Sequence, residues 1–297
     1  MRFPWERLYR DGEAPEEITL TDARATYFRL HKEGGEERFQ RDTNLPVDAF
    51  MALAGDRPLP SYTRDQANCY RDAMTAKGNK TATVRRRLRV LSAVFNMAKR
   101  EHSLTMVNPF EGIIIARDGI DATPRLPFSL EELRTLMVAC RKSDDDRRHI
   151  LSIQLDTGAR LSEIVGLRRE DVFLTDTIPH IIIRANRALG RRVKTEVSAR
   201  RVPLVGEALW GTTRAMAEAA KVKDHGEWLF PRYATDGKVK GNHASATLNK
   251  WMKTLPGVEG TTHSFRHAMR DRMREAGIPE DIRDAIDGHG TRPCGRI

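Results

Sequence analysis

Apolar side chains recur at three- and four-residue steps in several segments of the first 117 residues. This spacing is typical of a helix with one buried face. The longest such segment spans residues 83–101, and shorter ones cover residues 23–32, 47–54 and 64–77. The apolar positions of the longest segment are Val84, Leu88, Leu91, Phe95 and Ala98. The pattern predicts a small all-helical domain over residues 1–117.

The periodicity is lost between residues 118 and 127. This segment contains Gly119, Pro124 and Pro127, and glycine and proline often interrupt regular structure and mark exposed connections. We expect a linker over residues 118–127 and a second domain over residues 128–297.

Helical patterns resume in the second domain. Ser129 followed by two glutamates is typical of a capped helix start, and an apolar stretch over residues 150–155 ends at Gly158. The chain turns there and continues as a helix. Arg160 is therefore expected at or beside the first turn of that helix.

β-branched residues then predict a hairpin or a small sheet. Isoleucines occupy positions 181–183, and residues 193–204 have the composition of a second strand after a turn at 189–190. Lys194 would lie on this strand or at its start. The predicted fold is mostly α-helical with a small β-sheet.

A final helix is expected to open at Thr262 and to end at Gly277. Its buried stripe would consist of Phe265, Met269, Met273 and Ala276. His263 and Arg266 are three positions apart, so their side chains project to the same side of this helix.

The charge balance indicates a class of partner. The chain has 51 Lys and Arg against 41 Asp and Glu, a net charge of +10, and such a surface attracts polyanions. On the helix over residues 83–101 the basic face includes three candidates for DNA contact, Arg85, Arg86 and Arg89. No apolar run approaches the length of a membrane span and the first residues are charged, so we expect a cytoplasmic protein without membrane attachment.

Cysteine usage indicates neither disulfides nor a Cys-x-x-Cys metal site. The three cysteines, Cys69, Cys140 and Cys294, are an odd number at wide spacing. They are interpreted as reduced thiols.

Each candidate residue also has an ordinary structural explanation. Arg160 and Arg266 are compatible with solvated surface positions, and His263 with a helix start. Lys194 is one lysine on a basic segment, and His289 follows a helix end. The basic face of residues 83–101 is also what a solvated helix surface would show. The order of these residues along the chain favours a shared function.

Four segments occur in an order that resembles the catalytic domain of the tyrosine recombinases, the phage-type integrases. They are residues 157–164 (Thr-Gly-Ala-Arg-Leu-Ser-Glu-Ile), residues 193–204 with Lys194, residues 263–267 (His-Ser-Phe-Arg-His) and residues 288–289 (Gly-His). The upstream helices are similar to the family's core-binding domain. The resemblance implies a helical core-binding domain followed by an α+β catalytic domain.

The resemblance also implies site-specific DNA recombination or integration through a transient 3′-phosphotyrosyl DNA intermediate. The implied catalytic residues are Arg160, Lys194, His263, Arg266 and His289. Guanidinium groups suit the non-bridging oxygens of a phosphate that gains charge in the transition state, and a lysine can protonate the departing 5′ oxygen. The implied partners are double-stranded DNA and further protomers assembled on it. The chemistry requires no metal and no cofactor, because a covalent protein–DNA bond conserves the energy.

The chain departs from the family at the nucleophile. In the family a tyrosine follows the last motif histidine by about nine residues, which corresponds here to about position 298. All five tyrosines lie upstream of His263, and the sequence ends at Ile297. We therefore expect a recombinase truncated, or altered in reading frame, just before its nucleophile and inactive in strand cleavage.

Two other functions remain open on the sequence. A non-catalytic DNA-binding protein that occupies recombination sites would account for the missing tyrosine. A zinc hydrolase would use His263 and His267, which have the i, i+4 spacing of a metal-binding helix. Against the hydrolase, Ser264 stands where such helices carry glutamate, and Arg266 would place a cation beside the metal.

Overall fold

The computed structural model describes residues 17–124, 126–184, 199–221, 227–235 and 238–288. The chain divides into two compact units, residues 1–123 and 124–297, and each has a hydrophobic core of its own. The boundary falls within residues 118–127, where the periodicity is lost. The described elements are mostly helices with a small three-stranded sheet, which confirms the predicted fold class.

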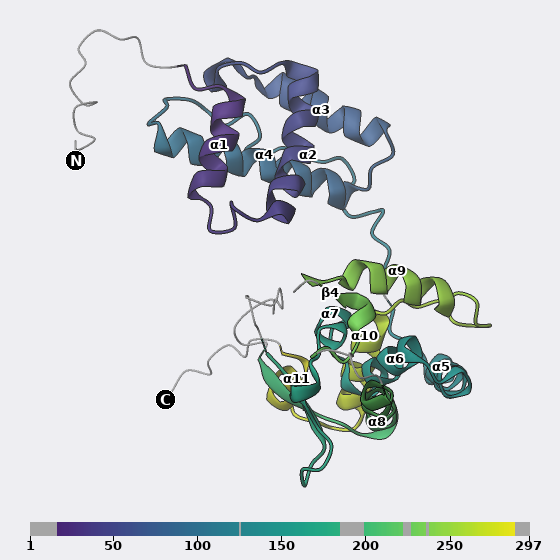
Figure 1. The fold of residues 1–297 in the computed structure, drawn as a ribbon. Helices are drawn as coiled ribbons and strands as arrows, with labels where there is room; N and C mark the ends of the chain where they lie inside the picture. Colours follow the sequence, from purple (N-terminus) through teal and green to yellow (C-terminus); the bar gives the residue numbers. More distant parts are fainter. Residues whose placement is uncertain (1–16, 125, 185–198, 222–226, 236–237, 289–297) are drawn as a thin grey trace, which may run out of the picture. The chain divides into compact units, whose positions relative to one another are not determined.

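The first unit packs its α-helices around the longest of them. The helices are α1 (Leu20–Leu30), α2 (Glu37–Ala54), α3 (Arg64–Ala76) and α4 (Thr81–Glu101). α4 packs against each of the other three and crosses behind α1 and α2 in Figure 1. Thr19 and Asp22 exchange hydrogen bonds that cap α1. The buried rings of Phe50, Phe95 and Phe110 meet edge to face in the core.

α2 is longer than its sequence indicates. It begins at Glu37, whereas the periodicity predicted a helix only from residue 47. The buried positions of α2 are Thr43, Pro46, Val47 and Phe50, which follow helical spacing. A threonine and a proline occupy two places on the buried face, and proline is unfavourable inside a helix, so the hydrophobic pattern did not include them.

Helix α6 (Asp146–Thr157) is the centre of the second unit. It is buried without a break from His149 to Leu155 and packs against four other α-helices. These are α5 (Leu130–Ser143), α7 (Leu161–Val165), α8 (Gly206–Lys221) and α10 (Ser264–Glu275). Figure 1 shows α5 and α8 close to α6. The remaining α-helices of the described part are α9 (Gly241–Met252) and α11 (Glu280–Asp287).

Two small antiparallel sheets complete the second unit. The strands are β1 (Val172–Phe173), β2 (His180–Ile183), β3 (Arg200–Pro203), β4 (Ala234–Thr235) and β5 (Lys238–Val239). The first sheet has the order β1-β2-β3 with Ile181 opposite Val202, and β4 pairs with β5. The strand predicted over residues 193–204 is observed at 200–203, and residues 193–198 lie outside the described residues.

The buried stripe of α10 is one turn shorter than predicted. Phe265 and Met273 are buried, but Ala276 is exposed. α10 ends at Glu275, and Gly277 adopts a positive φ of 71° that redirects the chain toward α11. The prediction for Ala276 was wrong because periodicity does not show where a helix leaves the core.

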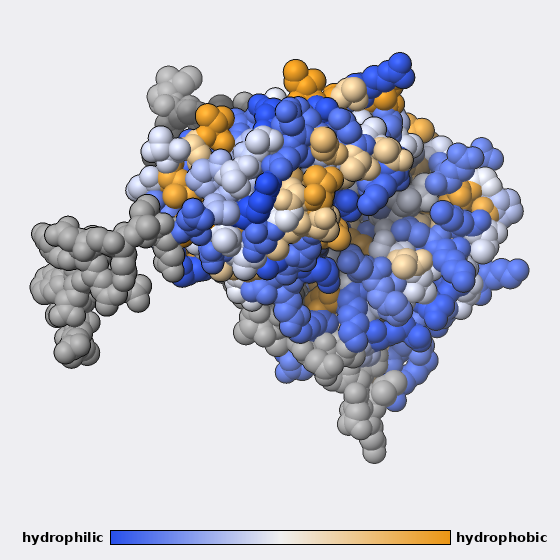
Figure 2. Space-filling view, turned by 90° about the horizontal axis from the view of Figure 1, so that it is seen from above, coloured by the Kyte–Doolittle hydropathy of each residue, from blue (hydrophilic) through white to orange (hydrophobic). Residues whose placement is uncertain are grey.

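The surface in Figure 2 is mostly hydrophilic, and its apolar residues form separate patches. Within the described ranges, no helix is both long enough and apolar enough to cross a membrane.

Candidate functional site

The turn between α6 and α7 organises the candidate site. Gly158 ends α6 in the left-handed conformation with φ +59°, and a Cβ atom there would lie 2.9 Å from Cβ of Met269 on α10. The backbone angle and the close approach of α10 therefore both require glycine. The hydroxyl of Thr157 accepts a hydrogen bond from the Ala159 N–H at 3.2 Å. Arg160 follows as the N-cap residue of α7.

Glu163, one turn into α7, holds Arg160 in place. The Arg160 guanidinium donates to this carboxylate at 2.8 Å, and so does the Arg160 backbone N–H, also at 2.8 Å. Arg200 on β3 donates to the same carboxylate at 3.0 Å. Burial would raise the pKa of Glu163, but the hydrogen bonds from Arg200 and Arg160 outweigh burial and hold this pKa below its ordinary value. The carboxylate stays charged and fixes the direction of the Arg160 side chain.

Arg266 approaches the same turn from α10. Its guanidinium donates to the carbonyl of Gly158 at 3.1 Å and to the carbonyl of Asp287 at the end of α11. Burial lowers the pKa of Arg266, the cations Arg160 and Arg200 act in the same direction, and the Asp287 carboxylate opposes them. Cations brought together in this way are stabilised by a bound anion, and guanidinium groups suit the oxygens of a phosphate.

His263 immediately precedes α10 and is exposed. Its ring lies edge to face with the ring of His267, with the ring centroids 4.9 Å apart. In the part of the chain that the structure describes, no group of three His, Cys, Asp or Glu side chains is placed to hold a metal ion.

Lys194 and His289, the other two predicted catalytic residues, lie outside the described residues. Two neighbouring segments are described. β3 begins at Arg200, and Gly288 ends α11 in the left-handed conformation with φ +65°. The Arg200 side chain donates to the carbonyl of Ile286 at 2.6 Å, so β3 is bonded to the last turn of α11.

Arg200 and Glu163 also belong to this site, although no role was expected for either residue from its place in the sequence. The position of Glu163 could have been recognised, because an acidic residue three positions after a helix start commonly accepts a hydrogen bond from the N-cap backbone N–H. Arg200 had no such signal, because its contact with Glu163 joins positions 37 apart in the chain.

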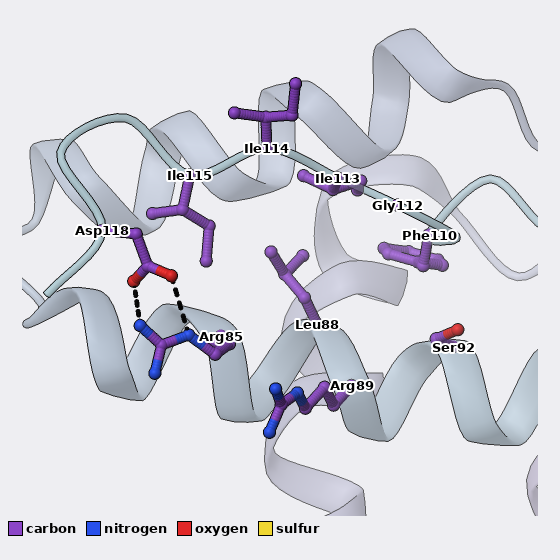
Figure 3. A pocket seen from close by; sticks show the side chains of 10 residues that line it. All are labelled: Arg85, Leu88, Arg89, Ser92, Phe110, Gly112, Ile113, Ile114, Ile115 and Asp118. Atoms are coloured by element: carbon purple, nitrogen blue, oxygen red, sulfur yellow. Dashed lines mark hydrogen bonds and ion pairs between the residues drawn. The ribbon is translucent and has the colours of Figure 1, made fainter.

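α4 carries the basic residues predicted to contact DNA. Arg86 and Arg89 are exposed. The Arg85 guanidinium instead faces the Asp118 carboxylate with two hydrogen bonds, and Nε lies 2.9 Å from one oxygen (Figure 3). Arg85 and Arg89 line a groove of about 490 Å³, which residues 113–115 border on the other side. Of the three predicted DNA-contact residues, two are therefore exposed cations and the third, Arg85, is paired with Asp118.

The fold and the site together define a class of protein, in which a helical unit precedes an α+β unit that brings Arg160 and Arg266 to the turn at Gly158. Residues 128–291 match the phage integrase family, and this match covers more than half of the chain. The chain therefore belongs to the phage integrase family, the tyrosine recombinases.

Two relatives illustrate the similarity in sequence. Tyrosine recombinase XerC 2 of Ralstonia nicotianae is 28% identical over 173 residues, which is 56% of this chain and 46% of that protein. The shufflon-specific DNA recombinase of Escherichia coli is 27% identical over 159 residues, which is 51% of this chain and 40% of that protein. The matched region is thus about half the length of these relatives.

Two solved structures illustrate the similarity in fold. The Tn1549 transposon integrase, in complex with transposon right end DNA, has a TM-score of 0.70 and 22% identity, over 92% of each chain. The lambda integrase tetramer bound to a Holliday junction has a TM-score of 0.68 and 17% identity, over 100% of this chain and 84% of that one. At such identities the similarity establishes a shared fold.

Proposed function

We propose that this chain acts in site-specific DNA recombination and holds the scissile phosphate of double-stranded DNA between Arg160 and Arg266. The observation that carries the proposal is the turn at Gly158, which Arg160 follows and whose carbonyl Arg266 binds. Membership of the phage integrase family and similarity to named DNA recombinases support it. Because related folds are DNA-bound integrases, one of them a tetramer, we propose duplex DNA and further protomers as the partners.

The proposed chemistry is a phosphoryl transfer to a tyrosine. Attack of its hydroxyl on phosphorus forms a 3′-phosphotyrosyl bond and breaks the bond to the 5′ oxygen. Arg160 and Arg266 would stabilise the charge that develops on the non-bridging oxygens. We assign the proton taken up by the 5′ oxygen to Lys194, and the handling of the tyrosine's proton to His263 and His289.

The nucleophile is not among residues 1–297. The five tyrosines are Tyr9, Tyr27, Tyr62, Tyr70 and Tyr233, and all precede His263. The last four are buried, and burial raises the pKa of each of them, which disfavours the nucleophilic phenolate. We therefore expect this polypeptide to bind DNA without forming a covalent adduct.

The test is to incubate the purified chain with nicked, site-containing duplex and to denature the mixture in detergent. A native gel should show a complex, and the denaturing gel should show no covalent species. A chain extended to carry a tyrosine at about position 298 should form the adduct. In that extended chain Arg160→Ala should slow cleavage by about 100-fold or more. An adduct mapped to any of the five tyrosines, or undiminished cleavage by Arg160→Ala, would contradict the assignment.

A second candidate function is that of a non-catalytic protein that occupies recombination sites. Both functions require DNA binding, so affinity does not separate them. The extended chain does: failure of the added tyrosine to form any adduct, with DNA binding intact, would favour the second function.

A further inference from the structure

Gln154 is a buried amide within the apolar helix α6. Its neighbours on the helix include the fully buried Ile153, and Gln154 itself is 1% exposed. The side-chain nitrogen Nε2 lies 3.2 Å from the carbonyl oxygen of Ala159 and 3.2 Å from that of Thr262. One amide group therefore bonds to two backbone segments that are more than 100 positions apart in the chain.

The two acceptors of Gln154 immediately precede two candidate catalytic residues. Ala159 precedes Arg160, and Thr262 precedes His263. A primary amide has two N–H donors in a fixed plane, so using both on these carbonyls sets the distance and the angle between the two peptide groups. A shift of either peptide would move the residue that follows it.

The oxygen of the same amide makes this arrangement energetically unfavourable. Oε1 of Gln154 is buried and has no hydrogen-bond partner among the described residues. An unpaired buried acceptor is destabilising, and a leucine would fill this apolar position without that penalty. The amide is therefore poorly explained by packing, and its two bonds to Ala159 and Thr262 are what distinguish it from an apolar side chain.

We propose that Gln154 is a positioning residue that fixes the Arg160 turn relative to the start of α10. The proposal rests on the proposed function, because the geometry it maintains is that of a phosphate site. Arg266 also connects the two segments through Gly158, but Arg266 would contact the phosphate itself. Gln154 holds the two segments together through their backbone carbonyls and does not contact the reacting atoms.

The test uses inorganic phosphate as the probe and the full 297-residue chain labelled with ¹⁵N in its arginines. In the unmodified chain, the side-chain Nε–H signals of Arg160 and Arg266 should shift together with a single dissociation constant. Gln154→Leu should weaken phosphate binding by about tenfold and separate the two titrations, because small displacements of paired groups reduce their joint binding strongly. Gln154→Met, which keeps the length of the side chain without its donors, should do the same and replaces the leucine variant if that variant does not fold.

Ile153→Val is the matched control. It shortens a fully buried side chain on the same helix and should lower thermal stability while leaving the phosphate titrations unchanged. If both Gln154 variants bind phosphate as the unmodified chain does, the proposal is overturned and the phosphate site stands. If Arg160 and Arg266 show no response to phosphate in the unmodified chain, the proposed phosphate site fails, and the role of Gln154 fails with it.

Discussion

At the scale of single residues, Gly158 combines two requirements that can be separated. A side chain there meets the left-handed φ of +59° and a contact of 2.9 Å with Met269, whereas Gly78 has a φ of +75° and no atom within 4 Å of the added Cβ. We expect Gly158→Ala to lower the free energy of unfolding by about 2–3 kcal/mol, and Gly78→Ala by about 1 kcal/mol. Urea denaturation measures both. Equal losses would show that α10 moves aside without cost.

At the same scale, Glu163 makes the stability of the fold depend on pH. Its side chain is 2% exposed between Arg160 and Arg200, so Glu163→Gln leaves a buried cation without its counter-charge and should cost about 3 kcal/mol. The folded-state pKa of Glu163 lies below its ordinary value. Its stabilising contribution is therefore present above the ordinary glutamate pKa and is lost as the pH falls through the folded-state pKa.

Urea midpoints between about pH 7 and about pH 3 measure this contribution. The Gln variant should lose less stability than the unmodified chain over the acidic part of this range. Glu170→Gln is the control, because Glu170 is 58% exposed in its pair with Arg168 and should change stability by less than about 1 kcal/mol. If Glu163→Gln loses no more stability at neutral pH than Glu170→Gln does, the buried ion pair is not important for stability.

At the scale of elements, the cations of α4 differ in whether they are exposed or paired with a carboxylate. Arg86 and Arg89 are exposed, and exposed cations that contact phosphates release counterions from DNA. Replacing both by Ala should weaken duplex binding and reduce the slope of log affinity against log salt by about 2. Fluorescence anisotropy at several salt concentrations measures the slope. The matched control replaces Arg38 and Arg41 of α2, which are 73% and 72% exposed; an equal change there would remove α4 from the interface.

Asp118 adds a second prediction for α4. Because its carboxylate faces the Arg85 guanidinium, Asp118→Asn should leave Arg85 able to pair with a phosphate and strengthen duplex binding by about threefold. Asp65→Asn on α3 removes the same charge from an exposed position. If the two variants bind DNA equally tightly, the gain comes from net charge and not from Arg85.

At the scale of the whole molecule, the two separate cores predict two unfolding transitions. Phe95 belongs to the core of the first unit and Phe265 to that of the second, and both are fully buried. Phe95→Ala should lower the unfolding free energy of the first unit by about 3–5 kcal/mol and shift one calorimetric transition to lower temperature. Phe265→Ala should have a similar effect on the second unit and on the other transition. A single transition that both variants shift equally would show that the units unfold cooperatively.

The fold was largely readable from the sequence where its signals are local. The core of α4 and the ends of α6 and α10 followed from apolar spacing and from Gly158 and Gly277. α2 was only half recovered, because Thr43 and Pro46 fill buried positions. These residues pack well without being recognised as apolar, so only the surrounding core shows that they are inside.

The sequence by itself determined the helical first unit, the interruption before the second unit, and the order of the motif residues that place the chain in its family. Periodicity, capping and motif spacing are properties of neighbouring residues, so they can be read along the chain. Only the tertiary structure decided that Arg266 binds the Gly158 turn, that Arg200 shares Glu163 with Arg160, and that Asp118 neutralises Arg85. These contacts join positions 108, 37 and 33 apart, and such pairs are fixed by how helices and strands pack together, which no local pattern specifies.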